Sequence, residues 1–450
     1  MNLPGRFQKS LEKLSIPPTI KSYVVAYSGG VDSHALLNLC AQASLSSGDI
    51  SIRAIHINHG LQADADSWSL HCAKICAALN IPFLDIRVEV KTGQGESPEE
   101  AARKARYKAL YAEIKPDECL LTAHHMDDQS ETLLIQLFRG AGSAGLASMP
   151  LVRTVDGVLH ARPMLEFTRD EIQSYAQEHQ LSWIEDASNE DTGFDRNLIR
   201  HKVLPLIKQR WQQVDVSLSR VASQQQHMLE ISEAMAKVDL ASIVTAQADV
   251  LSIVALKRLS EARQLNVLRW WIRQYGEDGP TSNVLHQVVD TVLTAAEDAE
   301  PVVKWRQSEI RRYQNGLYLI SGQKHLSGLQ HDDLKSTEWK PRKKLVLLNA
   351  GVELLAGLDK ERGLHKELLD KTLEVRFRQG GEKIRPVGRK NKHSVKKLMQ
   401  EAGIPPWRRN TVPMIYDNDD LLCVCGYWLA DDFVVANGER GWIPVCNFID

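Results

Sequence analysis

Four short apolar runs in the first 140 residues are each followed by a segment with helical periodicity. The runs cover residues 23–27, 50–57, 83–90 and 120–123, and the helical segments begin near residues 35, 66, 99 and 128. Strands that alternate with helices predict βαβ units and a parallel sheet. Ligands bind such sheets at the carboxyl ends of the strands, near the point where the strand order reverses. The loops after Tyr27, Ile57 and Ala123 are therefore the expected location of a functional site.

A glycine-rich loop with the sequence SGGVDS stands between the first strand and the first helix. Gly29 and Gly30 let consecutive backbone N–H groups turn toward an anion, and the N-terminus of the next helix carries partial positive charge. Asp32 can hold a divalent cation that bridges phosphate oxygens. The predicted nucleotide-binding residues are Ser28, Gly29, Gly30, Val31, Asp32 and Ser33, with His56 and Asn58 after the second strand. The alternative is a tight turn in which Asp32 and Ser33 only cap the helix.

The cysteines and histidines do not form a recognisable metal motif. The seven cysteines include no CxxC pair, which disfavours zinc ribbons and redox centres and predicts buried, reduced thiols. His56 and His59 are three residues apart at the end of the second predicted strand. We interpret this pair as a turn or a nucleotide contact rather than as a zinc site.

Two further segments carry charged residues with helical spacing. Arg103 and Arg106 are three residues apart, so both guanidinium groups can clamp one phosphate or carboxylate; the alternative is a solvated helix face. After the fourth strand, the motif HHMDDQSET places Asp127, Asp128 and Glu131 at the start of a helix. These carboxylates predict a magnesium-binding or proton-handling cluster, or else acids that only stabilise the helix N-terminus.

The loop SGGVDS resembles the PP-loop of the N-type ATP pyrophosphatases, which cleave ATP to AMP and pyrophosphate. The motifs SGGVDS, HINHGL, SPEE with AARKARY, HHMDDQSET and RNLIRHKVLP, in this order, closely resemble the tRNA(Ile)-lysidine synthase family. The resemblance implies a PP-loop ATPase domain of the adenine nucleotide alpha hydrolase-like type. It also implies an enzyme that uses ATP to adenylate cytidine 34 in the CAU anticodon of tRNA(Ile). Free L-lysine then displaces AMP to give lysidine, which changes the codon specificity from AUG to AUA.

The same resemblance implies roles for the charged residues. The PP-loop holds the pyrophosphate, Mg²⁺ binds at Asp32 and Asp128, and the two arginines stabilise charge on the α-phosphate. Displacement of AMP by lysine needs a neutral amine, so one of the carboxylates in HHMDDQSET is the expected base or lysine anchor. The sequence leaves the assignment among them open. The expected catalytic residues are Asp32, Arg103, Arg106, Asp127, Asp128 and Glu131.

Positive charge is concentrated in one segment, although the whole chain has a net charge of -2. Residues 374–410 hold eleven Lys and Arg but only three Asp and Glu, a local charge of +8. This pattern indicates a solvated face or a surface that follows a sugar-phosphate backbone. The segment also resembles the C-terminal domain of the same family, which implies that it binds the body of the tRNA. The expected tRNA-binding residues are Arg196, Arg200, Arg385, Arg389, Lys396, Lys397, Arg408 and Arg409.

The chain divides into three predicted domains and a linker. They are a catalytic α/β domain with a parallel sheet (1–212), a mainly helical middle domain expected to contact tRNA (213–322), a linker (323–341) and a small α+β basic domain (342–450). No apolar run reaches the roughly 18 residues of a membrane span, and no signal-peptide pattern is present, so we expect a cytoplasmic protein without a membrane partner. A homodimer is one option that the sequence leaves open.

Two other interpretations share the PP-loop. Enzymes that form 2-thiocytidine in tRNA have the loop but use CxxC pairs for an iron–sulfur cluster, and such pairs are missing here. A non-catalytic module that binds a nucleotide or tRNA would keep the loop and the basic segment without needing the carboxylates of HHMDDQSET. The presence of these carboxylates favours an enzyme.

Overall fold

The chain divides into two units, Met1–Ser232 and Glu233–Asp450, each of which makes most of its contacts within itself. The computed structural model describes residues 2–47, 51–58, 65–90, 98–186, 190–245, 249–275, 279–296, 299–320, 336–347, 351–359, 363–436 and 438–448. His59, Ser97 and most of the predicted linker (residues 323–335) lie outside these ranges. No helix within them is long and apolar enough to cross a membrane.

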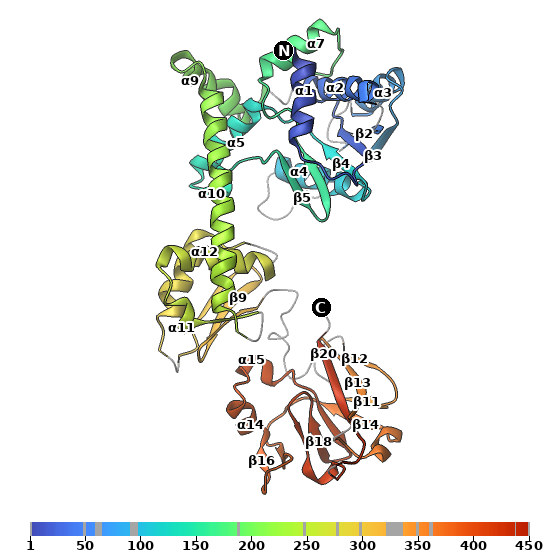
Figure 1. Ribbon diagram of the computed structural model, residues 1–450, viewed down its shortest axis with the longest axis vertical. Helices are drawn as coiled ribbons and strands as arrows, with labels where there is room; N and C mark the ends of the chain where they lie inside the picture. Colours follow the sequence, from blue (N-terminus) through green and yellow to red (C-terminus); the bar gives the residue numbers. More distant parts are fainter. Residues whose placement is uncertain are drawn as a thin grey trace. The chain divides into compact units, whose positions relative to one another are not determined.

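A six-stranded sheet forms the centre of the first unit, in the order β3-β2-β1-β4-β6-β5 (Figure 1). Neighbouring strands from β3 to β6 are parallel, and β5 runs antiparallel to β6. The strands are β1 (Ser22–Ala26), β2 (Ser51–Asn58), β3 (Phe83–Arg87), β4 (Glu118–Leu121), β5 (Val152–Val155) and β6 (Val158–Ala161). The strand order reverses between β1 and β4, so the carboxyl ends of these two strands border the crevice in which such sheets bind ligands.

Helices cover both faces of this sheet because successive residues of each strand point to opposite sides. Tyr23 and Val25 of β1 belong to a core closed by α1, α2, α3 and α7, whereas Val24 packs with Leu110 of α4 on the other face. These helices are α1 (Leu3–Lys13), α2 (Val31–Ser47), α3 (Ala65–Ala78), α4 (Pro98–Ala112) and α7 (Arg169–Glu178). The sheet is therefore buried on both sides, as expected for parallel strands.

The remaining helices of this unit gather around α5, which follows β4. They are α5 (Met126–Phe138), α6 (Ser143–Leu146), α8 (Asp195–Leu198), the π-helical segment η2 (Ile199–Val203), α9 (Leu204–Arg210) and the long α10 (Val214–Ile243). Leu134 of α5 packs with Ile199 and Leu204. The chain after residue 195 thus returns to the helix that starts at the sheet's binding edge.

The second unit begins with helices packed around a four-stranded antiparallel sheet in the order β7-β10-β9-β8. Its elements are β7 (Val250–Ser252), α11 (Ile253–Leu256), α12 (Glu261–Tyr275), α13 (Ser282–Gln287), the π-helical η3 (Val288–Leu293), β8 (Val302–Trp305), β9 (Ser308–Tyr313) and β10 (Gly316–Ile320). Trp271 is fully buried at the centre of the core between these helices and strands.

The C-terminal part of the second unit is rich in strands. It contains β11 (Thr337–Trp339), β12 (Leu345–Leu347), β13 (Val352–Asp359), the 3₁₀ turn η8 (Lys366–Asp370), β14 (Leu373–Arg376), β15 (Lys383–Ile384), β16 (His393–Ser394), α14 (Val395–Glu401), α15 (Pro406–Arg409), β17 (Met414–Asp417), β18 (Asp420–Val424), β19 (Trp428–Leu429), the 3₁₀ turn η9 (Asp431–Phe433) and β20 (Gly441–Phe448). One five-stranded sheet, one three-stranded sheet and the hairpin β15-β16 arise from these strands.

The predicted fold class is confirmed, with two additions that the hydrophobic pattern did not indicate. The hairpin β5-β6 turns at Asp156 and Gly157, whose φ angles of 50° and 81° fit the Asp-Gly turns that favour tight hairpins. This hairpin adds an antiparallel edge to the otherwise parallel sheet. The second addition is β7, which is only three residues long and lies in a segment predicted to be helical. Its pairing with β10 outweighs the local preference.

Candidate functional site

The glycine-rich loop between β1 and α2 is held in shape by its own serine hydroxyls. The Oγ atom of Ser33 accepts a hydrogen bond from the backbone N–H of Ser28 at 3.2 Å and donates to the carbonyl oxygen of Gly30 at 3.0 Å. The hydroxyls of Ser28 and Ser33 lie 3.0 Å apart. The first N–H groups of α2 have no partner inside the helix and stand at the same end. The loop therefore presents backbone donors and a helix N-terminus to one point, which is the geometry of a phosphate site.

Position 29 requires glycine for two reasons. Its φ angle is +88°, and an added Cβ atom would lie 2.7 Å from Cδ1 of Ile184 and 3.0 Å from Sγ of Cys72. Ile184 also donates its backbone N–H to the carbonyl oxygen of Gly29 at 3.0 Å. By contrast, the atom nearest to a Cβ on Gly30 would be Oγ of Ser28, at 3.7 Å. Sequence reasoning missed Ile184 because it lies more than 150 positions after the loop that it supports.

A cavity of about 350 Å³ opens at the carboxyl ends of β1, β2 and β4. The residues predicted to bind a nucleotide that line it are Ser28, Gly30, Asp32, Ser33, His56 and Asn58, joined by Trp68, Arg106, Tyr107, Thr122 and His124. Nδ1 of His56 lies 2.9 Å from the carbonyl oxygen of Tyr27, and the amide of Asn58 donates to Asp66 at 3.2 Å. These bonds hold the end of β2 against the glycine-rich loop and α3.

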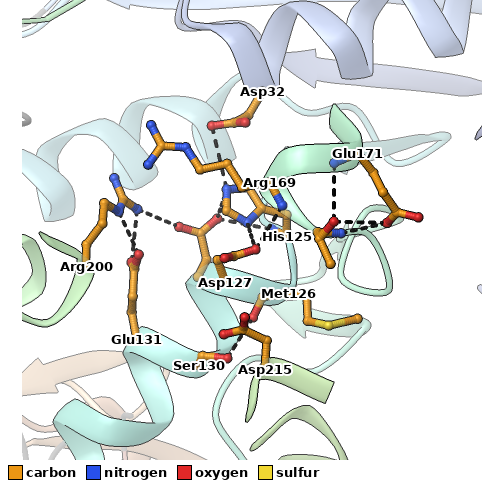
Figure 2. A network of polar contacts seen from close by, with 12 residues as sticks. Asp32, His125, Met126, Asp127, Ser130, Glu131, Arg169, Glu171, Arg200 and Asp215 are labelled. Carbon is orange, nitrogen blue, oxygen red and sulfur yellow. Dashed lines mark hydrogen bonds and ion pairs between the residues drawn. The ribbon is translucent and has the colours of Figure 1, made fainter. Parts of the chain in front are cut away.

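Three carboxylates surround the ring of the buried His125 in this site (Figure 2). Its Nε2 atom lies 3.4 Å from Oδ2 of Asp128 and 3.7 Å from Oδ2 of Asp32, and its Nδ1 atom lies 3.7 Å from Oδ2 of Asp127. Burial alone would lower the pKa of His125, but Asp128, Asp32 and Asp127 together raise it to about 9. The ring is therefore a cation at neutral pH, which offsets the repulsion among the three neighbouring carboxylates. His125 was not among the predicted site residues, although its position beside the acids in HHMDDQSET was a usable signal.

Asp127 connects three helices. Its Oδ2 atom accepts the backbone N–H of Arg169 at 2.8 Å, and its Oδ1 atom accepts Nζ of Lys208 at 2.9 Å. The same Nζ atom lies 2.6 Å from Oδ2 of Asp215. Burial disfavours the ionised form of Asp127, but the bonds from Arg169 and Lys208 outweigh it and lower its pKa. These contacts favour a role in joining α5 to α7, α9 and α10 over the predicted role as a base.

Glu131 is also fully occupied by partners, because it is 1% exposed and binds two arginines. Its Oε2 atom lies 2.8 Å from Nε of Arg196, and its Oε1 atom lies 2.6 Å from Nε of Arg200. Arg200 reaches Oδ1 of Asp128 as well, at 3.2 Å. The other oxygen of Asp128 accepts the backbone N–H of His125 at 3.1 Å. Arg196 and Arg200, which we expected to contact tRNA, therefore neutralise buried acids.

Arg103 and Arg106 do not form the predicted common clamp. Their guanidinium groups lie 5.2 Å and 5.4 Å from the ring centre of Tyr107, which directly follows Arg106 in α4. Arg106 lines the cavity at the glycine-rich loop, whereas Arg103 lines a second cavity of about 550 Å³ with Tyr111 and Arg153. Burial, with a smaller contribution from Arg103, lowers the pKa of Arg106. Only Arg106 is thus placed to meet an anion in the first cavity.

One carboxylate oxygen in the first cavity lacks a partner. Oδ1 of Asp32 is buried and makes no hydrogen bond, whereas both oxygens of Asp128 are bonded to nitrogen atoms. Within the described ranges, no group of three or more His, Cys, Asp or Glu residues could hold a metal ion by itself. Mg²⁺ often binds proteins through one or two carboxylates together with substrate phosphates. Asp32 fits that mode, and Asp128 fits it less well than the sequence suggested.

Comparisons with known proteins cover nearly the whole chain. The family models that match are a PP-loop domain (residues 3–207), a TilS substrate binding domain (251–318) and a TilS substrate C-terminal domain (373–446). A tRNA(Ile)-lysidine synthase of Coxiella burnetii is 39% identical over 439 residues, which cover 97% of this chain and 95% of the relative. Those of Legionella pneumophila strain Paris and Shigella flexneri are 38% and 35% identical, over 95% and 94% of this chain and 96% and 95% of the relatives. The chain belongs to the tRNA(Ile)-lysidine synthase family.

In this member of the tRNA(Ile)-lysidine synthase family, acids neutralise part of the basic segment 374–410. Arg385 pairs with Asp431 and Asp432, and Arg389 pairs with Glu401 at 3.0 Å. Two of these three acids lie outside the segment, so the local charge counted along the sequence overstates the charge in space. The arginines remain at the surface, but each already has a carboxylate partner.

Arg408 and Arg409 both bind groups in the second unit, and their partners include residues that precede the basic segment. Arg408 pairs with Asp249 at 2.7 Å. Arg409 is 7% exposed and donates to the carbonyl oxygen of Ile404 at 2.8 Å and to the hydroxyl of Tyr313 at 3.0 Å. These two arginines, predicted to bind tRNA, thus fasten α15 to β9 and to the residue before β7.

Five exposed lysines provide free positive charge in this family member's basic segment 374–410. They are Lys383, Lys390, Lys392, Lys396 and Lys397, on the hairpin β15-β16, its connection and the first turn of α14. In the part of the chain that the structure describes, none of the five forms an ion pair. We call this set the lysine face. It contains two of the predicted tRNA contacts, Lys396 and Lys397.

The glycine-rich loop allows a paired test of its geometry. We expect Gly29→Ala to lower the free energy of unfolding by about 1–3 kcal/mol, because alanine at a positive φ is strained and its Cβ meets Ile184. Gly30→Ala is the matched control and should stay within about 0.5 kcal/mol of the parent, since the space around its Cβ is open. Urea unfolding of both variants measures the difference. Equal stabilities would contradict the assigned strain.

The buried Glu131 allows a test of whether it is structural. Glu131→Gln leaves Arg196 and Arg200 without their main partner, so we expect a loss on the order of 3 kcal/mol in the free energy of unfolding. The control is Glu166→Gln, which breaks only the exposed pair with Lys13 and should cost less than about 1 kcal/mol. A Glu131→Gln protein that is as stable as the parent but inactive would instead assign the carboxylate to the chemistry.

Proposed function

We propose that this protein joins free L-lysine to C2 of cytidine 34 in the CAU anticodon of a tRNA(Ile), with ATP converted to AMP and diphosphate. The product is lysidine, which pairs with A instead of G and changes the amino acid identity of the tRNA from Met to Ile. The observation that carries the proposal is the combination of a phosphate-binding loop at the sheet's switch point with similarity to lysidine synthases over nearly the whole chain. The protein would act in the cytoplasm with its tRNA.

The glycine-rich loop supports the first half of this reaction. Adenylation requires the C2 carbonyl oxygen of the cytidine to attack the α-phosphorus while pyrophosphate leaves from the opposite side. The backbone donors of residues 28–33 and the N-terminus of α2 would hold the pyrophosphate. Arg106 lines the same cavity and would stabilise negative charge on the α-phosphate. Its side chain is half-buried, so water screens this interaction less than it would at the surface.

The carboxylates have separate tasks in this proposal. Asp32 would bind Mg²⁺ through its unpartnered oxygen, and the ion would neutralise charge on the phosphate oxygens. His125 holds Asp32 and Asp128 in place, at 3.7 Å and 3.4 Å from its Nε2 atom. Asp127 and Glu131 connect the site to the helices after residue 169. This division replaces the expectation that any of the three acids in HHMDDQSET acts as the base or as the lysine anchor.

The lysine face would dock the body of the tRNA. Its five lysines are exposed, carry no ion pair among the described residues and come from a contiguous stretch of the second unit. Lysine side chains neutralise phosphates without reading sequence, which suits contact with an RNA backbone away from the anticodon. Arg385, Arg389, Arg408 and Arg409 are left out of this face because protein groups already hold them.

A radiolabel assay tests the reaction directly. The enzyme is incubated with [α-³²P]ATP, Mg²⁺, L-lysine and a tRNA(Ile) transcript with a CAU anticodon. We expect AMP release that requires both lysine and the tRNA, and a transcript with G at position 34 serves as the control. AMP release that ignores lysine would contradict lysidine formation and leave other PP-loop reactions, such as thiolation, as the alternative.

Charge reversal tests the docking surface. We expect the double variant Lys396→Glu/Lys397→Glu to weaken tRNA binding and to reduce the slope of log K against log salt concentration by about 2. ATP binding should remain unchanged, since the glycine-rich loop lies in the other unit. The matched control is Lys340→Glu/Lys366→Glu, which changes the total charge equally at exposed positions outside the lysine face. Equal losses in both double variants would show that only net charge matters.

A further inference from the structure

A chain of polar side chains runs through the first unit from β5 to the nucleotide cavity. Arg153 donates from a terminal nitrogen to the hydroxyl of Tyr111 at 2.6 Å and from Nε to Nδ1 of His160 at 3.4 Å. The Tyr111 hydroxyl lies 3.1 Å from the same Nδ1 atom. Nε2 of His160 lies 2.9 Å from Oγ1 of Thr122, which lies 2.8 Å from Nδ1 of His124. The last member, His124, lines the cavity.

The middle of the chain is closed to water. His160 is 0% exposed on β6, and Thr122 is 5% exposed just after β4. Buried polar groups without partners are costly, so each hydrogen in this chain has to meet an acceptor. The pattern of donors and acceptors is therefore set by the residues themselves rather than by solvent.

Arg153 sets the donor-to-acceptor direction of these hydrogen bonds because a guanidinium group has donors but no acceptor. Nδ1 of His160 faces Nε–H of Arg153, so this ring nitrogen must carry a lone pair. A neutral imidazole has one N–H group, and the proton of His160 therefore sits on Nε2. Burial, followed by the charges of Arg162 and Arg153, lowers the pKa of His160 to about 2, which keeps the ring neutral. His160 accordingly donates to Thr122.

Thr122 continues the same donor-to-acceptor order, because it accepts a hydrogen bond from His160 and donates one to His124. Its Oγ1 atom accepts from His160, and the one remaining contact of this buried oxygen within the described residues is Nδ1 of His124. The hydroxyl proton must point to that nitrogen, which is then an acceptor. Burial lowers the pKa of His124 well below its usual value; Asp128 opposes this effect, while Arg162, Arg196 and Arg103 add to it. The remaining proton of the neutral ring sits on Nε2, which no described residue bonds.

We propose that Arg153, His160 and Thr122 are positioning residues that hold His124 as a neutral imidazole with its Nε2–H directed into the nucleotide cavity. The identity of the acceptor rests on the proposed function: it is a phosphate oxygen of the ATP bound at the glycine-rich loop. A neutral donor of this kind can strengthen its hydrogen bond as charge develops on that oxygen without giving up a proton. His124 follows β4, and the glycine-rich loop follows the neighbouring strand β1. The imidazole N–H and the backbone N–H groups of the loop therefore approach the phosphates from the same edge of the sheet.

The variants Thr122→Asn and Thr122→Asp test the donor-to-acceptor direction of the hydrogen bonds. They differ only in that one has an amide NH₂ group where the other has a carboxylate oxygen. The amide of Asn can accept from His160 and still donate to Nδ1 of His124. The carboxylate of Asp can only accept, so it places a proton on Nδ1 of His124. NMR of protein labelled with ¹⁵N in its histidine rings reads the state of each nitrogen, and His124→Asn assigns the signals.

We expect an unprotonated Nδ1 of His124 in the parent, in Thr122→Ser and in Thr122→Asn, and a protonated Nδ1 in Thr122→Asp. Parent protein with Nδ1 of His124 protonated would overturn the proposal, and so would identical His124 signals in the Asn and Asp variants. This readout needs no catalysis, so it stands apart from the test of the proposed function.

Pyrophosphate release tests what the fixed tautomer does. Thr122→Ser and Thr122→Asn should stay within about threefold of the parent rate, whereas Thr122→Asp should lose about a hundredfold, as for the removal of one donor to a reacting oxyanion. Ala123→Asp controls for the added charge in the cavity; it should keep the parent's NMR pattern and lose less activity. Equal rates for the Asn and Asp variants, or a larger loss in Ala123→Asp, would contradict the role of the tautomer.

Discussion

The buried charge cluster at the start of α5 is the interaction on which the rest of the site depends. Glu131 and Asp128 are removed from water, and such carboxylates are tolerated only when cations and hydrogen bonds compensate them. Arg196 and Arg200 supply this compensation from a segment more than 60 positions later. The helices after residue 195 are therefore fastened to the edge of the sheet by charge as well as by the packing of Leu134.

His125 gives this cluster a second function. Its imidazolium ring stands between Asp32 of the glycine-rich loop and the acids of α5, so it links the two loops that follow β1 and β4. The parallel sheet brings these loops to one edge, and the histidine cation lets their carboxylates share a small volume. Beside it, His124 remains neutral because burial lowers its pKa well below the usual value, and nearby arginines add to this effect while Asp128 opposes it. Two adjacent histidines thus differ in charge because their surroundings differ.

Much of the architecture could be predicted from local pattern. The alternation of strands and helices and the glycine-rich loop both appear in the structure because each depends on residues close in sequence. The individual tasks of the charged residues could not be predicted in this way. Arg196 and Arg409 look like solvent-facing cations in the sequence, yet one binds Glu131 and the other lies buried beside Tyr313. The lysines of the lysine face are exposed, and none of them forms an ion pair with an acid that the structure describes.

The sequence by itself determined where an anion can bind, because glycine at position 29 and the start of α2 create a phosphate site from six consecutive residues. It also determined the family, through motifs spread along the whole chain. Only the tertiary structure decided which charges remain available for a substrate. Electrostatic partners are chosen by distance in space, and the arginines, the histidines and their acids come from strands and helices that meet only when the sheet has formed. The same reason explains why the hydrogen-bonded side chains from Arg153 to His124 are invisible in the sequence: the five residues come from four separate segments, namely α4, β5, β6 and the loop after β4.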